Sequence, residues 1–448
     1  MAGRGRPLWF RPPVAAGPPS LRSESVGFTK LVARPATHGR LQVNVLDSHD
    51  ARLLRAGITV AHRRFDDGPG EWYVAAPDWP GLPDEASYPL DGTGELPEEV
   101  RRRLGIFLRG EALGPFATLD CARKDYVLRG PDADVLDIRD EVCTVTVDGE
   151  TRSRTREITM TPRAKLQPQQ RDFLVSALAA ADASPLPQPP TLQQRIGPPA
   201  TGLTSFRAPT GFRGDMTLEE FVSETLLGDL HALVMAELLD DRAEERDAFG
   251  RLLLDLRGLS LVVDPSWEEA LEHDVRAFTV APREDRQVLL PRIIEALVGG
   301  VRAPRLGDHG ADDARVELCT RVERSLMILF DRCRALEVDG PDEAWLAAMR
   351  SAPRLPPPVQ LAEPLFRKPA RKLSLALGEL ADVLRASVPP PEDIELVGLS
   401  VEEAFRLGRD VEHARAGVLR ARAELISSWP ERVAQGRKAL KKLWRRAT

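Results

Sequence analysis

The last 18 residues of the chain gather cationic side chains at close spacing. The only acid among them is Glu431, and Val433, Leu440 and Trp444 are interspersed. Such a segment can bind an anionic surface, a nucleic acid or polyphosphate. A frayed terminal helix that lysines keep soluble has the same composition, so both interpretations stay open. The polyanion-binding candidates in this segment are Arg437, Lys438, Lys441, Lys442 and Arg445.

The cysteines and histidines lack the spacing of a metal site. Cys121, Cys143, Cys319 and Cys333 contain no CxxC pair, so four reduced thiols in a cytoplasmic protein are expected. No apolar run reaches the ~20 residues that a membrane span requires. We therefore expect a cytoplasmic protein with no membrane partner.

The charges are balanced in the N-terminal part and acidic beyond it. Residues 1–200 carry 26 basic and 26 acidic groups, and residues 201–448 carry 36 basic and 42 acidic groups. Neither part has the positive field of a general nucleic-acid binder, so nucleic acid is not an expected partner. The acidic C-terminal part could instead contact a protein partner.

The N-terminal part predicts β-structure with two helices. Short alternating segments bounded by Gly, Pro and Asp are typical of strands. The predicted strands cover residues 40–46, 58–65, 71–76, 116–120, 126–129, 135–139, 143–147 and 154–160, and the predicted helices cover residues 97–109 and 167–181.

A Pro-, Gly- and Ser-rich stretch then marks a domain boundary. Beyond it the apolar residues recur at helical spacing, and capping boxes are predicted at Thr217–Glu220, Ser266–Glu269 and Ser400–Glu403. The predicted fold class is α+β multidomain: an antiparallel β-tunnel or barrel followed by an all-α bundle of about six to eight helices. The predicted divisions are a disordered basic leader at 1–25, a β-domain at 26–197, a linker at 198–215 and a helical domain at 216–448.

Residues 46–64 (LDSHDARLLRAGITVAHRR) predict a polar turn, a helical turn with Leu53 and Leu54, a break at Gly57 and a strand. This segment resembles the YxDTxxxxLxxxGxxLRxR signature of the CYTH, or triphosphate tunnel, family. The segments WYVAAP at 72–77, DEASYPL at 84–90, LDIRDEV at 136–142 and REITMTP at 156–162 resemble later family strands in the same order. The resemblance covers about residues 24–197.

The resemblance implies a polar barrel in which Arg and Lys bind a triphosphate and carboxylates hold Mg²⁺ or Mn²⁺. Position by position, the implied phosphate-binding candidates are Lys30, Arg63, Arg123 and Lys124. The implied metal candidates are Glu85, Asp137, Asp140 and Glu157.

Many of the family's site positions carry other residues here. Val26 and Phe28 stand where the N-terminal glutamates are expected, and Ala61 stands where the first tunnel arginine is expected. Ala75 replaces a strand lysine. A hard cation requires oxygen ligands, and phosphoryl transfer depends on placed charges, so these losses predict a catalytically degenerate tunnel. The surviving charges could equally form an internal salt-bridge network.

The C-terminal part resembles the CHAD family, a helical domain commonly fused to CYTH domains. RKPARKLSLALGELADVL at 367–384 resembles a late helix of that family, and residues 403–433 resemble its closing segment. CHAD domains bind polyphosphate through basic helices with a motif histidine, and neither copy of that motif is found here.

We therefore expect a degenerate bacterial CYTH–CHAD fusion that acts as a regulatory or interaction module with weak binding of polyphosphate or another phosphate polyanion. One alternative is an active triphosphatase that uses Mg²⁺ or Mn²⁺ in a rearranged site and acts on tripolyphosphate or a nucleoside triphosphate. A second alternative is a purely structural protein–protein scaffold.

Overall fold

The computed structural model describes residues 6–66, 68–90, 95–389 and 400–447. The chain divides into two compact units, Met1–Ser205 and Phe206–Thr448. Their boundary lies inside the stretch predicted as a linker. No helix in the described part of the chain is long and apolar enough to span a membrane.

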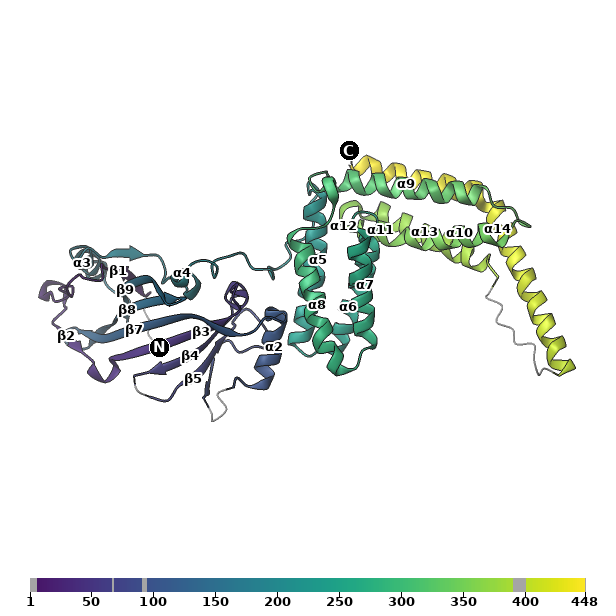
Figure 1. Cartoon of the computed structure of the whole chain (residues 1–448). Coiled ribbons are helices and arrows are strands. Elements are labelled where there is room, and N and C mark those ends of the chain that lie inside the picture. Colours follow the sequence, from purple (N-terminus) through teal and green to yellow (C-terminus); the bar gives the residue numbers. More distant parts are fainter. Residues whose placement is uncertain (1–5, 67, 91–94, 390–399, 448) are drawn as a thin grey trace. The chain divides into compact units, whose positions relative to one another are not determined.

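The first unit is built on a ten-stranded antiparallel sheet (Figure 1). The order along the sheet is β10-β1-β9-β8-β7-β3-β4-β5-β6, and β2 pairs with β7 outside this path. The end strands β10 and β6 do not pair with each other among the described residues, so the sheet is open and its hydrogen bonds close no barrel. The strands are β1 (Leu8–Arg11), β2 (Lys30–Ala33), β3 (Gly39–Asp47), β4 (Thr59–Phe65), β5 (Glu71–Ala75), β6 (Ala86–Pro89), β7 (Gly114–Arg129), β8 (Asp134–Val147), β9 (Glu150–Pro162) and β10 (Ser184–Leu186).

Two of these strands are longer than predicted. Segments 116–120 and 126–129 belong to the single strand β7, and segments 135–139 and 143–147 belong to β8. Charged residues in the middle of both strands interrupt the apolar alternation and resemble loops. In the structure they continue the ladder, since Arg123 and Glu141 lie opposite each other and form an ion pair.

The N-terminal leader is not wholly disordered, and this prediction was wrong for residues 8–11. Strand β1 pairs with β9 on one side and with β10 on the other. Its Phe10 side chain is 2% exposed. Burial of this aromatic ring stabilises a strand that its Pro- and Gly-rich surroundings conceal in the sequence.

The segment at 46–64 folds as predicted into a turn, the helix α1 (Arg52–Arg55) and the strand β4. Asp47 organises it: its buried carboxylate accepts hydrogen bonds from the backbone N–H groups of Ser48, Leu53 and Leu54 at 2.7, 2.9 and 2.8 Å. Burial raises the pKa of Asp47, and these three bonds oppose that rise. Gly57 then takes a positive φ of 78°, which glycine adopts without strain.

Three further helices accompany the sheet: α2 (Glu98–Leu108), α3 (Pro168–Ala179) and α4 (Leu192–Ile196). Helix α3 adds Leu174 and Leu178 to a core that contains Phe28. Helix α4 adds Ile196 to a second core around Val45. Two separate apolar clusters therefore pack against different parts of the sheet.

The second unit, called the helical unit below, contains α5 to α14 (Figure 1). Helices α5 to α8 contact one another in a four-helix group, and α14 contacts both α9 and α13. The all-α class predicted for this part is confirmed. The helices are α5 (Leu218–Leu238), α6 (Arg242–Leu259), α7 (Pro265–Val280), α8 (Arg283–Arg302), α9 (Ala314–Arg334), α10 (Asp342–Ser351), α11 (Pro356–Leu361), α12 (Glu363–Phe366), α13 (Lys368–Ala386) and α14 (Val401–Ala447).

Two of the three predicted capping boxes are present. Thr217 with Glu220 and Ser400 with Glu403 exchange side-chain and backbone hydrogen bonds. The third prediction was wrong, because Asp264 caps α7 through the N–H groups of Ser266 and Trp267. The Asp264 carboxylate accepts both hydrogen bonds. Asp264 is the N-cap residue, and Pro265 follows it at the first helical position.

The cysteines also differ from the prediction of four reduced thiols. Cys121 on β7 and Cys143 on β8 lie directly opposite each other and form a disulfide, with their Cα atoms 4.1 Å apart. Cys319 and Cys333 are buried free thiols. Closeness across two strands joined by a tight turn was not visible in the 22-residue spacing.

Candidate functional site

The register of the sheet decides which predicted site residues share a face. Arg63 on β4 lies opposite Val43, which lies opposite Leu119 on β7. Arg123 follows Leu119 by four residues and lies opposite Glu141. Opposed residues, and residues an even number apart on one strand, point to the same face. Arg63, Arg123 and Glu141 therefore share one face, called the polar face below.

Two of the predicted metal candidates lie on the polar face as well. Asp137 precedes Glu141 by four residues on β8, and Glu157 lies opposite Glu141 on β9. The sheet thus brings two predicted cations and two predicted carboxylates to one side.

Two other candidates lie on the opposite face. Lys124 and Asp140 lie opposite each other on the other face of the sheet. Asp140 is bound there by Arg156 through bonds of 2.8 and 2.7 Å. Lys30 on the short strand β2 lies opposite Arg129, six residues after Arg123, so it belongs to the polar face, where its side chain is exposed. Period-two alternation therefore separates Arg123 from Lys124, although they are neighbours in sequence.

Arg63 is occupied by groups of its own unit. Its Nε and Nη2 atoms donate to Glu71 Oε1 at 3.0 and 2.7 Å, and Nη2 also donates to Ser87 Oγ at 2.9 Å. The guanidinium carbon lies 3.8 Å from the centre of the Tyr73 ring. Burial is the main cause that raises the pKa of Tyr73, and the nearby Glu85 carboxylate raises it further. Glu85 is thus close to this cluster, next to a phenol that hydrogen-bonds to it.

Arg123 belongs to a chain of alternating charges. Its guanidinium contacts Glu141 at 3.2 Å, and Glu141 also lies 3.7 Å from Arg195. Arg195 donates to Glu157 at 2.5 Å, and Glu157 lies 3.5 Å from Arg11. Neither carboxylate is free to hold a divalent cation without losing an arginine.

Asp137 lies beside a polar cavity of about 680 Å³. Arg163 binds its carboxylate at 2.8 and 3.1 Å, and Arg34 lies 3.8 Å away. Asp125 and Arg139 line the same cavity and form a further ion pair at 3.4 Å. The arginines and carboxylates described on the polar face therefore form matched pairs beside apolar residues such as Leu119, and their local field is small.

The C-terminal cations have a different environment. Helix α14 continues through them to Ala447. Arg437, Lys441 and Arg445 are spaced by four residues, as are Lys438 and Lys442, which places all five along one side of the helix. All five are exposed. We call these five residues the basic surface.

The opposite side of α14 is packed on α9. Leu440 and Leu443 are buried, and Trp444 Nε1 donates to Glu323 Oε2 at 3.0 Å. A Cβ atom at Gly436 would lie 2.6 Å from Phe330 Cζ, so any larger residue would force the Phe330 ring to shift. This packing fixes which side of the helix faces outward.

The basic surface has no carboxylate partner in the part of the chain that the structure describes. None of its five side chains forms an ion pair within 4.0 Å in residues 6–66, 68–90, 95–389 or 400–447. Two of the candidates on the sheet, Lys30 and Lys124, are likewise unpaired over the same ranges, but they are isolated. The basic surface is therefore the strongest grouping of free cations among the predicted site residues.

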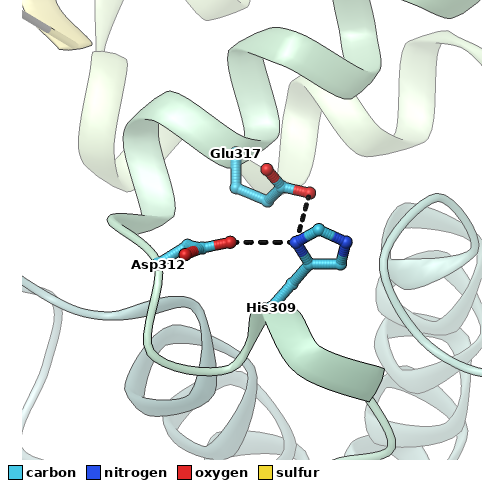
Figure 2. Close-up of side chains that lie close together, drawn as sticks. All are labelled: His309, Asp312 and Glu317. Atoms are coloured by element: carbon cyan, nitrogen blue, oxygen red, sulfur yellow. Dashed lines mark hydrogen bonds and ion pairs between the residues drawn. The ribbon is translucent and has the colours of Figure 1, made fainter.

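Sequence reasoning missed a histidine cluster near the start of α9 (Figure 2). His309 Nδ1 lies 2.9 Å from Asp312 Oδ2 and 3.8 Å from Glu317 Oε1. The same Glu317 oxygen accepts a hydrogen bond from Arg321 at 2.6 Å. The ring and this carboxylate oxygen are thus already engaged by groups of the protein.

Sequence reasoning also missed a pair of carboxyl groups inside the helical unit. Asp229 on α5 and Asp255 on α6 line a cavity of about 950 Å³. Burial raises the pKa of Asp229 well above its usual range and raises that of Asp255 to about 6. The two residues lie on consecutive helices and belong to no recognised motif.

No family model and no curated protein matches this chain. Among solved structures, a candidate adenylate cyclase from Bacillus halodurans is similar, with 10% sequence identity and a TM-score of 0.21. The aligned region covers 37% of this chain and 86% of the Bacillus halodurans chain. A candidate adenylyl cyclase from Hippeastrum, described as having a dominant triphosphatase activity, is similar at 13% identity and a TM-score of 0.22. It covers 44% of this chain and 98% of that one. Likenesses this weak establish neither a shared fold nor a shared activity.

Proposed function

We propose that this protein binds phosphate polyanions, with long-chain inorganic polyphosphate as the expected ligand, through the basic surface of α14, and that its sheet is a non-catalytic scaffold. The observation that carries the proposal is the absence of carboxylate partners at the basic surface within the described residues. A row of phosphates can contact several of these cations at once. Each phosphate–cation contact releases bound counterions and does not require an internal ion pair of the protein to break.

Such binding is weak and strongly dependent on salt. Exposed charges interact over about 8 Å at physiological ionic strength, so each contact contributes little. Avidity along a long polyanion compensates, because neighbouring phosphates bind intramolecularly once the first is bound. The ligand is therefore expected to be an extended chain rather than a single phosphate.

The polar face supports the non-catalytic part of the proposal. A triphosphate there would have to displace Glu71 from Arg63 and Glu141 from Arg123. Each lost charge-assisted bond costs about 1.5–3 kcal/mol. The apolar replacements Phe28 and Ala61 are also built into the interior, because both are 0% exposed. An apolar interior supplies no oxygen ligands for Mg²⁺ or Mn²⁺.

The test is a titration of the full chain with long-chain polyphosphate at low and at physiological salt. The triple variant Lys438→Gln, Lys441→Gln, Lys442→Gln should bind at least about 10-fold more weakly, and its salt slope should fall by about 2. The control variant Arg406→Gln, Arg409→Gln, Arg420→Gln removes the same charge from exposed positions of the same helix. If both variants lose affinity equally, binding follows net charge and the basic surface is not the site.

A metal-dependent triphosphatase is the second candidate, favoured by the single observation that Arg63, Arg123, Asp137 and Glu157 share a face. It predicts Mg²⁺- or Mn²⁺-dependent phosphate release from tripolyphosphate or a nucleoside triphosphate. Arg63→Ala and Glu85→Ala should each abolish that release. Absence of turnover over a broad substrate panel excludes this candidate while leaving polyphosphate binding intact.

A further inference from the structure

The cavity lined by Asp229 and Asp255, of about 950 Å³, lies within the helical unit and far along the sequence from the basic surface. Helices α5 and α6 form one wall, the segment that contains Pro209 and Phe212 forms another, and α11 to α13 complete it. Phe212, Leu254 and Pro357 make much of the lining apolar. Its size is at the upper end of the range for small-molecule sites.

One buried polar group in this lining lacks a donor. Asp229 is 6% exposed, and its Oδ2 atom receives no hydrogen bond from the described protein. Its partner is another carboxyl group, that of Asp255. Two carboxyl groups can share one proton, but together they offer more acceptor positions than donors. A buried acceptor without a donor is costly, so it points to a donor supplied from outside the chain.

The other carboxylates of the cavity are already satisfied. Glu224 accepts the N–H groups of Thr210 and Gly211 and contacts Arg207 at 3.0 Å. Glu363 binds Arg371. Only the Asp229 and Asp255 pair is therefore short of donors among the described lining residues.

Free cations lie on the same lining. Arg367 and Lys368 are exposed, and neither forms an ion pair within the described residues. Arg251 on α6 lies close enough to the carboxyl pair to lower the pKa of both of its members. The cavity thus combines an acceptor-rich, buried end with a cationic, exposed edge.

We propose that this cavity binds a small anion that also carries a primary ammonium group. The ammonium donates hydrogen bonds to Asp229 and Asp255, and the anionic group binds Arg367 and Lys368. A simple anion would leave the buried carboxyl pair without donors. A divalent cation would find only two carboxylates here, fewer than its usual ligand number, and no third acidic or histidine ligand clusters with them in the described residues.

The ammonium group should bind best when the carboxyl pair is ionised. The other charged groups that line the cavity are Glu224 on α5, Arg251 on α6 and, from α12 and α13, Glu363, Arg367, Lys368 and Arg371. Below about pH 6 Asp255 is protonated, which removes the charge that attracts the ammonium. The advantage given by the ammonium should therefore shrink as the pH falls through this value.

The test uses matched probes on the full chain. Calorimetric titrations compare aminoethyl-, aminopropyl- and aminobutylphosphonate with the alkylphosphonates of the same length. Near neutral pH, at least one aminoalkylphosphonate should bind about 10-fold more tightly than the alkylphosphonate of the same length. The ratio of these two affinities should fall at about pH 5. Asp229→Asn should abolish the ratio, whereas Lys368→Gln should weaken both members of the pair.

Asp382→Asn is the control, since this acid is exposed on α13 and is paired with Arg385 outside the cavity. It should leave every affinity unchanged. The proposal is overturned if no amino compound binds at millimolar concentration, if the alkylphosphonates bind equally well, or if the ratio survives in Asp229→Asn. Because the basic surface is untouched by these variants, polyphosphate binding serves as the separate readout of the proposed function.

Discussion

At the scale of single residues, Asp255 links the stability of the helical unit to pH. In the folded chain its pKa is about 6, mainly because of burial, whereas its ordinary value is 3.8. Between these values the folded chain holds a proton that the unfolded chain releases. Stability therefore falls as pH rises through this window, and the contribution present below about pH 4 is lost above about pH 6.

Asp255→Asn removes this titration. The free energy of unfolding of the variant, relative to the wild type, should rise by about 2 kcal/mol between pH 4 and pH 7. Urea unfolding followed by circular dichroism at several pH values measures it. Asp382→Asn supplies the comparison and should track the wild type throughout. Parallel curves for wild type and Asp255→Asn would show that Asp255 titrates normally.

Single residues of the candidate site could be predicted from the sequence more readily than the residues that pair with them in the structure. Arg63 follows from the signature at 46–64, but its occupation by Glu71 depends on the register of the β4–β5 hairpin. Asp229 and Asp255 leave no signal, because they sit on separate helices whose packing brings them together. A carboxyl pair of this kind is a product of tertiary structure, which one-dimensional patterns do not record.

At the scale of elements, β7 and β8 are tied by the disulfide between Cys121 and Cys143. The other two cysteines are shielded: burial raises the pKa of the Cys319 and Cys333 thiols to about 12, with the acids Glu323 and Asp313 adding to the effect at Cys319. A thiol with so high a pKa is almost entirely protonated at neutral pH and reacts slowly.

Thiol counting tests this arrangement. Protein purified without reductant should show almost no reactive thiol when folded, two after unfolding in denaturant and four after reduction. The Cys121→Ser, Cys143→Ser double variant is the control and should show two after unfolding with or without reduction. Four thiols in unfolded, unreduced wild type would restore the prediction of four reduced cysteines.

Element boundaries were predictable where local chemistry sets them. Ser400 and Glu403 mark the start of α14, and Gly57 marks the break before β4, because caps and glycine turns act over a few residues. The continuity of β7 was not predictable, since cross-strand ion pairs such as Arg123 with Glu141 support its charged middle. Strand β1 could not be predicted for a similar reason, because the strands that pair with it lie more than a hundred residues away in sequence.

At the scale of the whole molecule, each unit has its own apolar core. The first unit holds its two clusters around Phe28 and Val45, and the helical unit buries residues such as Trp345 and Phe221 at 0% exposure. A fragment covering residues 206–448 should therefore unfold cooperatively, with a midpoint within a few degrees of the matching transition in the full chain. Thermal denaturation followed by circular dichroism checks this.

Residues 1–205 serve as the reciprocal fragment. Their transition and that of the 206–448 fragment should together reproduce the full-chain curve. A helical fragment that melts without a cooperative transition would mean that its stability depends on the first unit. The fragment also allows polyphosphate titration of the basic surface without the sheet.

The packing of α14 makes the chain unequally tolerant of insertions. Arg422 is buried and donates to the carbonyl oxygens of Ser387, Val338 and Gly340, whereas residues 401–410 are almost entirely exposed. One residue inserted before position 401 leaves the helical phase of the rest of α14 unchanged relative to the buried Arg422. One residue inserted between Arg422 and Gly436 turns the rest of the helix by about 100°. Lys438 and Lys442 would then turn toward the side packed on α9, whereas Arg437, Lys441 and Arg445 would stay exposed, so the length of this short stretch determines how many of the cations act together.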